Sequence, residues 1–224
     1  MADKFFDATF YINLDERPDR KEKIIEEMNR LDLCVKYQRI PGVIYNGEYD
    51  SDIALSPDQI KHFNGIMGCM LSHLSILHWA LKHSATILIF EDDAKLINDF
   101  DTIIKGALLE LPKNWDMLYL GGNICNTVEQ ISPHLGRLSH SQSTHAYAVN
   151  KNFVGKLIEY IDPYNAVPLD LIYAYKVIPE NNCYITVPMV AVQRASFSDI
   201  ENAYVEYESW MEDRFYKNLK RIIT

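Results

Sequence analysis

Hydrophobic and polar positions change their period several times along the first part of the chain. Residues 4–14 are mainly aromatic and β-branched and have polar neighbours on both sides, which predicts a buried strand. Residues 15–33 carry Pro18 near their start and apolar residues at helical spacing, which predicts a helix. The stretch "VKYQRIPGV" then predicts a second strand. The order strand, helix, strand is typical of a βαβ unit with a parallel sheet.

The alternation continues beyond residue 55. Ser56 and Pro57 suit the cap and the first turn of a helix. A longer helix follows, with one apolar stripe formed by Ile66, Met70, Leu74, Leu77 and Leu81. The next predicted elements are a strand at 86–90, a helix at 98–112 and a strand at 115–122.

Residues 123–143 interrupt this pattern, because they are polar and show no clear period. They predict a long loop, and loops of that length in compact domains tend to be functional or mobile. The remaining predicted elements are a strand at 144–150, a helix at 151–161, a short helix at 168–177, a strand at 183–193 and a closing helix at 199–224.

The amino-acid composition excludes several classes of protein. The 224 residues are 48% hydrophobic and 24% charged, which fits one soluble globular domain. The net charge of −9 argues against a nucleic-acid partner, which requires clustered Lys and Arg. The four cysteines lack CxxC spacing, so we expect neither a zinc site nor a disulfide framework. No apolar leader or transmembrane segment is visible, and we expect a cytoplasmic chain.

Three consecutive acids, Glu91, Asp92 and Asp93, follow the apolar strand at 86–90. Ligands of open α/β sheets gather at the carboxyl ends of the strands. Because successive strand residues point to opposite faces, Glu91 and Asp93 can share one side. Such a pair suits Mg²⁺ or Mn²⁺ shared with a substrate diphosphate. A solvated loop or a helix cap is the alternative reading of the triplet.

Several ordered stretches resemble glycosyltransferase family 25. The first three are "YINLDERPDRK", "GIMGCMLSHLSIL" and "ILIFEDDAKL", and the later ones are "DMLYLGG", "THAYAVN", "PLDLIY" and "VAVQRASFSDI". The resemblance therefore spans Phe10 to about Ile200. The family includes bacterial lipooligosaccharide galactosyltransferases and collagen hydroxylysine galactosyltransferases. Lipooligosaccharide biosynthesis and collagen glycosylation are thus the two processes that the resemblance suggests.

The resemblance implies a GT-A-type α/β fold, with a Rossmann-like, mostly parallel sheet flanked by helices. It implies a single glycosyltransferase domain over residues 1–224, with a nucleotide-sugar-binding half at 1–122 and an acceptor-side half at 123–224. The implied activity is inverting transfer of galactose or glucose from a UDP-sugar, UDP-galactose or UDP-glucose, with Mn²⁺ or Mg²⁺ as cofactor. The expected acceptor is a glycan or a hydroxylysine-type hydroxyl.

The acidic motif of the family maps onto residues 91–93. We expect Asp93 and Glu91 to bind the metal, with Asp93 the safer ligand because the first position is Glu here instead of Asp. Asp170 has apolar neighbours and is the expected general base, which removes the proton of the acceptor hydroxyl. A helix N-cap is the alternative role of Asp170.

Further residues are expected to bind the donor: Asn13, Arg17, Arg20, Ser72, His73, Asp92, Gln193, Ser198 and Asp199. The two arginines suit a diphosphate through their forked donors, although arginines at a helix start are often solvated. Residues 72–73 could instead hydrogen-bond within the core, and residues 198–199 could cap the last helix.

Two other functional classes compete with a transferase. A catalytically degenerate domain of the same fold would be a binding or interaction module. Calorimetry with UDP, with and without Mn²⁺, separates the two, because a degenerate module should show no metal-linked binding. A nucleotidyltransferase also uses paired acids, but it would ordinarily have a glycine-rich phosphate loop after the first strand, and "NLDERPDR" has none.

Overall fold

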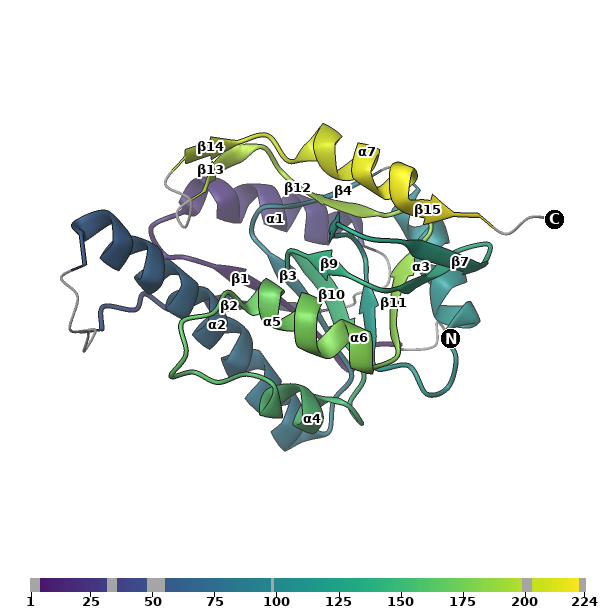
Figure 1. Ribbon diagram of the computed structural model, residues 1–224, viewed down its shortest axis with the longest axis horizontal. Helices are drawn as coiled ribbons and strands as arrows, with labels where there is room; N and C mark the ends of the chain where they lie inside the picture. The colour runs from purple at the N-terminus through teal and green to yellow at the C-terminus, as the bar shows by residue number, and fades with distance from the viewer. Residues whose placement is uncertain (1–4, 32–35, 48–54, 98, 199–202, 222–224) are drawn as a thin grey trace.

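The computed structural model describes residues 5–31, 36–47, 55–97, 99–198 and 203–221. Its centre is a nine-stranded sheet with the order β15-β7-β8-β11-β5-β10-β3-β1-β2 (Figure 1). The strands of this sheet are β1 (Ala8–Asn13), β2 (Tyr37–Pro41), β3 (Ile87–Glu91), β5 (Met117–Tyr119), β7 (Val128–Ser132), β8 (Leu135–Leu138), β10 (Ala146–Val149), β11 (Cys183–Thr186) and β15 (Leu219–Lys220). Short two-stranded pairs are formed by β4 (Ala94–Leu96) with β12 (Ala191–Gln193), β6 (Asn123–Ile124) with β9 (Ser141–Gln142), and β13 (Ser196–Ser198) with β14 (Ala203–Val205).

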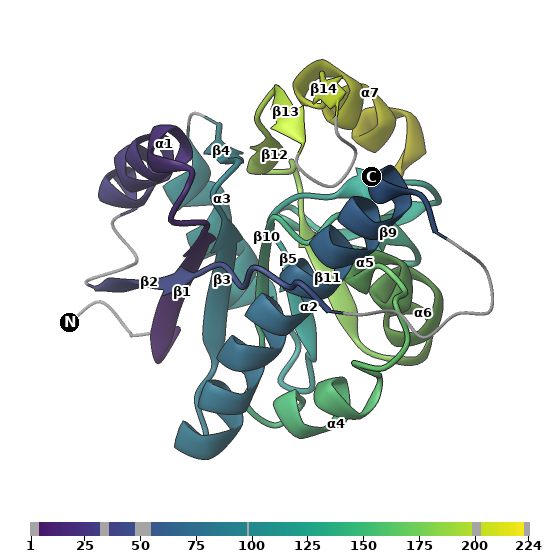
Figure 2. The same ribbon diagram turned by 90° about the vertical axis from the view of Figure 1, so that its left-hand side faces the viewer.

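Helices cover both faces of the sheet (Figure 2). One face carries α1 (Pro18–Arg30) and α3 (Phe100–Glu110). The other face carries α2 (Pro57–His83), α4 (Val154–Glu159), α5 (Leu169–Ile172), the π-helical stretch η1 (Tyr173–Val177) and α6 (Ile178–Glu180). The last helix, α7 (Glu208–Asn218), packs against β6 and β12.

Strand β3 shows why the central strands are apolar throughout. Ile87 and Ile89 belong to the core beneath α2, whereas Leu88 and Phe90 belong to the core beneath α1 and α3. All four side chains are buried. A strand that is covered on both faces has no solvent-facing positions, so it shows no polar alternation. The run "ILIF" therefore enters the middle of the molecule and ends where the acids begin.

The expected α/β class, with a sheet flanked by helices, is confirmed. Strand β1 pairs in parallel with both β2 and β3, as a βαβ unit requires. Strand β10 inserts antiparallel between β3 and β5, so the sheet is mixed on that side.

Within the part of the chain described here, no helix combines the length and the apolar character that a membrane span requires. The division into halves at residues 122 and 123 stays a prediction.

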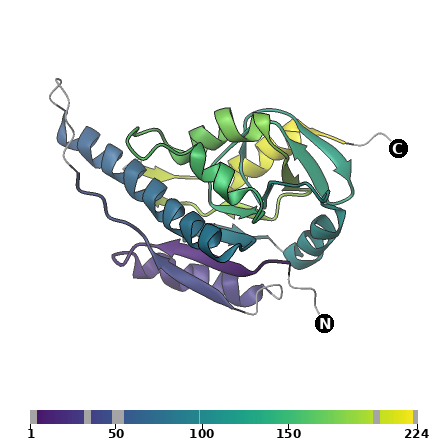
Figure 3. The same cartoon turned by 90° about the horizontal axis from the view of Figure 1, so that it is seen from below.

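Helix α2 is continuous over 27 residues and runs alongside α4 and α5 (Figure 3). Its start follows the sequence signal, because the Ser56 hydroxyl accepts from the backbone of Gln59 while the Gln59 side chain accepts from the backbone of Ser56. The expected apolar stripe holds from Ile66 to Leu77. Leu81 was expected on this stripe but is 51% exposed.

Three predicted elements differ from the structure. The long loop expected at 123–143 is wrong, because strands β6 to β9 occupy it and β7 and β8 extend the main sheet. Strands β6 and β9 are only two residues long, and three of the five residues of β7 (VEQIS) are polar, so no apolar run marks these strands. The strand expected at 183–193 is two strands, β11 and β12. The closing helix is shorter than expected, since β14 precedes α7 and β15 follows it.

Candidate active site

The acid triplet lies at the carboxyl end of β3. Glu91 is the last residue of that strand, and the next two acids form the turn into β4. Strand β4 pairs with β12, and Ala94 lies opposite Gln193. The backbone N–H of Arg194 also donates to the carbonyl oxygen of Asp93, at 2.7 Å. This pairing brings residues 193–194 to the acids, although about 100 positions separate them along the chain.

Asp92 is buried and hydrogen-bonded to two groups near the end of β1. Asn13 Nδ2 donates to its Oδ2 at 2.7 Å, and an Arg20 guanidinium nitrogen donates to its Oδ1 at 3.0 Å. Arg39 on β2 in turn donates to Asn13 Oδ1 at 3.1 Å. Burial raises the pKa of Asp92, and the Arg20 charge and the Asn13 hydrogen bond oppose this shift. Asp92 therefore orders the donors around it.

Asp93 is the least satisfied of the three acids. Its Oδ2 accepts a long hydrogen bond from Gln193 Nε2 at 3.4 Å and lies 4.0 Å from an Arg20 nitrogen. Its Oδ1 is buried and has no hydrogen-bond partner among the described residues. Burial, and then the negative charge of Glu91, raise the pKa of Asp93 to about 7. A nearby cation would therefore stabilise the ionised carboxylate considerably.

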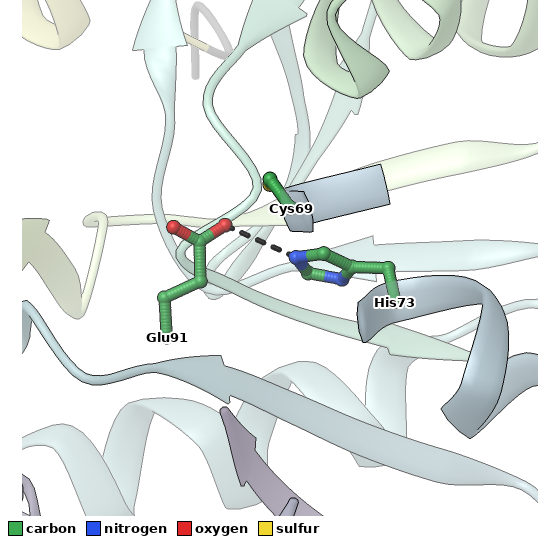
Figure 4. Close-up of side chains that lie close together, drawn as sticks. All are labelled: Cys69, His73 and Glu91. Carbon is green, nitrogen blue, oxygen red and sulfur yellow. Dashed lines mark hydrogen bonds and ion pairs between the residues drawn. The ribbon is translucent and has the colours of Figure 1, made fainter. Parts of the chain in front are cut away.

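Glu91 contacts two side chains that can donate hydrogen bonds to it. Thr144 Oγ1 donates to Glu91 Oε1 at 2.6 Å, and His73 Nε2 lies 3.3 Å from the same oxygen (Figure 4). His73 is fully buried, and its Nδ1 lies 2.9 Å from the hydroxyl of Tyr147. Burial works to raise the pKa of Glu91, but the His73 and Thr144 contacts outweigh it and the net shift is downward. Glu91 is therefore an ionised carboxylate at neutral pH.

Two different donor sets could bind a metal ion here. Cys69, His73 and Glu91 lie with their ligand atoms within 4.8 Å of one another (Figure 4). The Cys69 thiol is a soft sulfur donor, which Mg²⁺ and Mn²⁺ do not favour. The carboxylates of Asp93 and Glu91 are hard oxygen donors, and Asp93 has an unpartnered buried oxygen. The oxygen pair therefore fits Mg²⁺ or Mn²⁺ better than the mixed set fits any hard cation.

Two cavities open on either side of these residues. The first has a volume of about 530 Å³ and contains the acid triplet, the end of β1, residues 42–46 and one side of α2. The second has a volume of about 440 Å³ and lies between α2, α5, residues 142–144 and the start of α7. Both are lined by Cys69, Glu91, Gln193 and Tyr207. Two molecules could therefore bind side by side and meet at Glu91.

Most of the predicted site residues lie together. The first cavity is lined by Asn13, Arg20, Ser72, His73, Glu91, Asp92, Asp93 and Gln193. Asp170 lies instead in the second cavity, where it accepts hydrogen bonds from the backbone of Ser143 at 3.2 Å and of Leu171 at 2.9 Å. It does not cap α5, which begins at Leu169 without a side-chain cap. The roles predicted for the residues of the two cavities stay predictions.

Of the remaining predicted donor residues, Arg17 is not brought into the first cavity, and the side chains of Ser198 and Asp199 lie outside the description. The Arg17 side chain pairs with Asp19 at 3.1 Å and does not line the cavity. Arg17 is the N-cap residue of α1, whereas Arg20, one turn later, forms an ion pair with Asp92. Ser198 is the last residue of β13, and the description does not extend to its side chain. Asp199 lies outside the described residues.

Sequence reasoning missed several residues that line the two cavities or support their lining. Arg39 fixes Asn13, Thr144 fixes Glu91, and Ser196 accepts from Arg20 at 2.9 Å. Tyr207 and Trp210 form an aromatic wall of the second cavity. Arg39 carries a usable signal, because it is a charged residue within a predicted strand. The other residues lie in ordinary polar or aromatic stretches, and only the tertiary contacts single them out.

Comparison with known proteins identifies the class of this chain. A family model described as "Glycosyltransferase family 25 (LPS biosynthesis protein)" matches residues 6–173, which cover β1, the acid triplet and Asp170. This match places the chain among the glycosyltransferases. The chain belongs to glycosyltransferase family 25.

Some curated relatives have names that call them inactive, and others have names that refer to procollagen. The chain is 28% identical over 174 residues to "Probable inactive glycosyltransferase 25 family member 3" from Bos taurus, covering 68% of this chain and 29% of the relative. It is 26% identical over 230 residues to "Procollagen lysyl hydroxylase and glycosyltransferase" from Acanthamoeba polyphaga mimivirus, covering 86% and 26%. It is 31% identical over 131 residues to "Procollagen galactosyltransferase 1-A" from Xenopus laevis, covering 52% and 21%. The alignments thus span less than a third of these relatives.

Proposed function

We propose that this chain transfers a hexose, galactose or glucose, from a UDP-sugar to an acceptor hydroxyl with inversion, and that the reaction depends on Mn²⁺ or Mg²⁺. The observation that carries the proposal is the pair of adjoining cavities, one with Asp92 and Asp93 and the other with Asp170. Their common boundary at Glu91 is where a donor sugar and an acceptor hydroxyl would meet. Membership of a glycosyltransferase family supports this assignment.

The first cavity suits the donor. Its volume of about 530 Å³ lies within the range of small-molecule sites. Arg20, oriented by Asp92 and Ser196, supplies positive charge beside the acids. Asn13 and Ser72 line the cavity next to the apolar and aromatic side chains of residues 43–45, which could hold a nucleoside. A UDP diphosphate between Arg20 and Asp93 would lie at the carboxyl end of β3.

Asp93 and Glu91 would hold the divalent cation, because they supply the hard oxygen donors of this cavity. When bound, the cation offsets negative charge on the diphosphate as it leaves. Arg20 acts on the same charge from the side of α1. Both effects would be larger in this partly buried site than in water.

Asp170 is placed to act on the acceptor. In the proposed step, the acceptor oxygen attacks the anomeric carbon while the bond from that carbon to the UDP oxygen breaks on the opposite face. The hydroxyl proton passes to the Asp170 carboxylate. Burial raises the pKa of Asp170, which makes it a stronger base than an exposed carboxylate. The backbone N–H groups of Ser143 and Leu171 fix its position.

Removal of divalent cations tests the metal requirement. We expect turnover in EDTA to fall at least about 100-fold, because Asp93 and Glu91 would then face the diphosphate without a compensating charge. Excess Mn²⁺ should restore it. Release of UDP, measured with and without EDTA, checks this expectation, and full turnover in EDTA would show that the acids do not act through a metal.

Gly68 tests the wall of the donor cavity. A Cβ at this position of α2 would overlap the carbonyl oxygen of Val43, a backbone atom. Ser72 ties the same two segments, since its Oγ donates to Gly68 O at 2.6 Å and accepts from Val43 N at 2.8 Å. We expect Gly68→Ala to lower the free energy of unfolding by about 1–3 kcal/mol and to weaken UDP binding.

The control for Gly68 is Gly155→Ala on α4, whose Cβ would meet Leu81 at an ordinary 3.6 Å. This variant should be as stable as the wild type or slightly more stable, because alanine favours a helix. Chemical denaturation and UDP calorimetry compare the two variants. If the two variants have equal stability and equal UDP affinity, the contact of residue 43 with α2 does not contribute to either property.

A binding module without transferase activity is the second candidate. The observation that favours it is the similarity to relatives whose names call them inactive. The structure retains Asp93, Arg20 and Asp170, which favours activity. Calorimetry with UDP and Mn²⁺ together with a turnover assay separates the candidates. A module should show no turnover and no metal-linked binding of UDP.

A further inference from the structure

The second cavity has an aromatic wall supplied by the last helix. Tyr207 immediately precedes α7 and Trp210 lies in its first turn, with their ring centroids 6.2 Å apart. Both line the cavity. Trp210 is 37% exposed although it is among the largest apolar side chains of the protein. This wall lies beyond residue 173, where the match to the family model ends.

Neighbouring groups hold the indole ring in position. The guanidinium carbon of Arg214 lies 4.2 Å from the centroid of the Trp210 ring. The same guanidinium donates to Asn123 Oδ1 at 3.0 Å, and Asn123 lines the cavity. Arg214 itself does not line the cavity. Met211 and Phe215 anchor α7 in the core from its other side. The aromatic wall is thus preorganised, which lowers the entropic cost of binding.

The rest of the cavity lining includes neutral hydrogen-bonding groups. They are the amides of Asn123, Gln142 and Gln193 and the hydroxyls of Ser143 and Thr144. Amides and hydroxyls both donate and accept, which matches a ligand with several hydroxyl groups. The described lining residues include no Lys or Arg; His62 is the one basic side chain among them, and Glu91 and Asp170 are acidic. Such a lining disfavours an acceptor that carries a carboxylate or phosphate beside the reacting hydroxyl.

We infer that the second cavity binds the acceptor as a neutral pyranose ring, with the C–H face of the sugar packed against Trp210 and its hydroxyls directed to the amides and to Asp170. The inference deepens the proposed function and rests on it for the identity of the acceptor side. A pyranose ring has one face of C–H groups and a rim of hydroxyls, so it complements a cavity that combines an aromatic wall with polar side chains. A volume of about 440 Å³ gives room for such a ring.

Ligand-observed saturation-transfer NMR tests this inference without turnover. The probes are the methyl glycosides of galactose, glucose, mannose and N-acetylglucosamine, each titrated with UDP and diamagnetic Mg²⁺ present. Free hydroxylysine and the methyl glycoside of N-acetylneuraminic acid are the competing probes, one a cationic amino acid and the other an anionic sugar. We expect at least one neutral glycoside to bind, with the strongest saturation on the ring protons of one face.

Substitutions in α7 test whether the glycoside binds against Trp210. Trp210→Ala should weaken binding of the glycoside about tenfold, and Trp210→Phe should weaken it less, because it keeps an aromatic face. Tyr216→Ala is the control, since Tyr216 lies on the same helix, is 54% exposed and lines neither cavity. UDP affinity should be unchanged in all three variants. If Trp210→Ala loses UDP affinity through misfolding, the Trp210→Phe titration decides the result.

Several results would overturn the inference. These are no signal from any neutral glycoside, binding of hydroxylysine or of the anionic sugar in its place, or wild-type affinity for the glycoside in Trp210→Ala. The experiment is separate from the test of catalysis. A chain that binds a neutral glycoside through Trp210 but transfers no sugar would contradict the proposed function and support this inference.

Discussion

Asp93→Asn is expected to abolish transfer and to weaken Mn²⁺-linked binding of UDP together. Asp93 Oδ1 is buried without a hydrogen-bond partner among the described residues, and its carboxylate faces the donor cavity. An amide keeps the shape of the side chain but removes the charge that a divalent cation needs. One substitution would therefore damage both the ion and the diphosphate that the ion binds.

Calorimetry with UDP, in the presence and absence of Mn²⁺, together with an assay of UDP release measures both effects. We expect Mn²⁺ to strengthen UDP binding in the wild type and to have little effect in Asp93→Asn. Asp162→Asn is a matched control, because Asp162 is exposed and lies in neither cavity. If Asp93→Asn retains metal-linked UDP binding, the metal is held by other groups.

Asp170→Asn should have a different effect, with a loss of kcat and little change in UDP affinity. Asp170 lines the second cavity and not the first, so it should not touch the nucleotide. Asparagine keeps the shape of the side chain, but its single oxygen can accept from only one of the two backbone N–H groups, those of Ser143 and Leu171, that now donate to different carboxylate oxygens. It cannot take up the acceptor proton, and loss of a general base typically costs about 10²-fold or more in rate.

The same two assays, applied to Asp170→Asn, separate a base from a donor ligand. We expect UDP and Mn²⁺ affinity close to the wild type while UDP release in the presence of acceptor falls about 100-fold. Near-normal turnover would mean that another group is the base. Asp199, which lies outside the described residues, would then be the next position to substitute.

The sequence predicts the parts of this molecule that depend on local patterns. The run "ILIF" is apolar because β3 is covered on both faces, so the strand and the acids at its end can be read from the sequence. The Ser56 and Pro57 signal likewise predicts the start of α2. Residues near the end of β1, such as Asn13 and Arg20, reach the acids because β1 and β3 are parallel neighbours.

Long-range contacts explain what the sequence could not predict. Strand β10 enters the sheet antiparallel, and an apolar run does not reveal the direction of its pairing. Arg17 pairs with Asp19 and does not line the cavity. The spacing in the sequence does not show which of the two nearby arginines, Arg17 or Arg20, lies beside the acids. Trp210 reaches the second cavity because α7 packs on β6 and β12, which lie far from it in the sequence.

The most direct test of the proposed function is UDP release from a panel of UDP-sugars by the wild-type chain. The panel should include UDP-galactose, UDP-glucose and their N-acetylated forms, each with Mn²⁺ and with neutral methyl glycosides as acceptors. We predict release from UDP-galactose or UDP-glucose that depends on Mn²⁺ and increases with acceptor. Absence of release from every donor, by a folded protein tested with all these acceptors, would contradict the assignment as a hexosyltransferase.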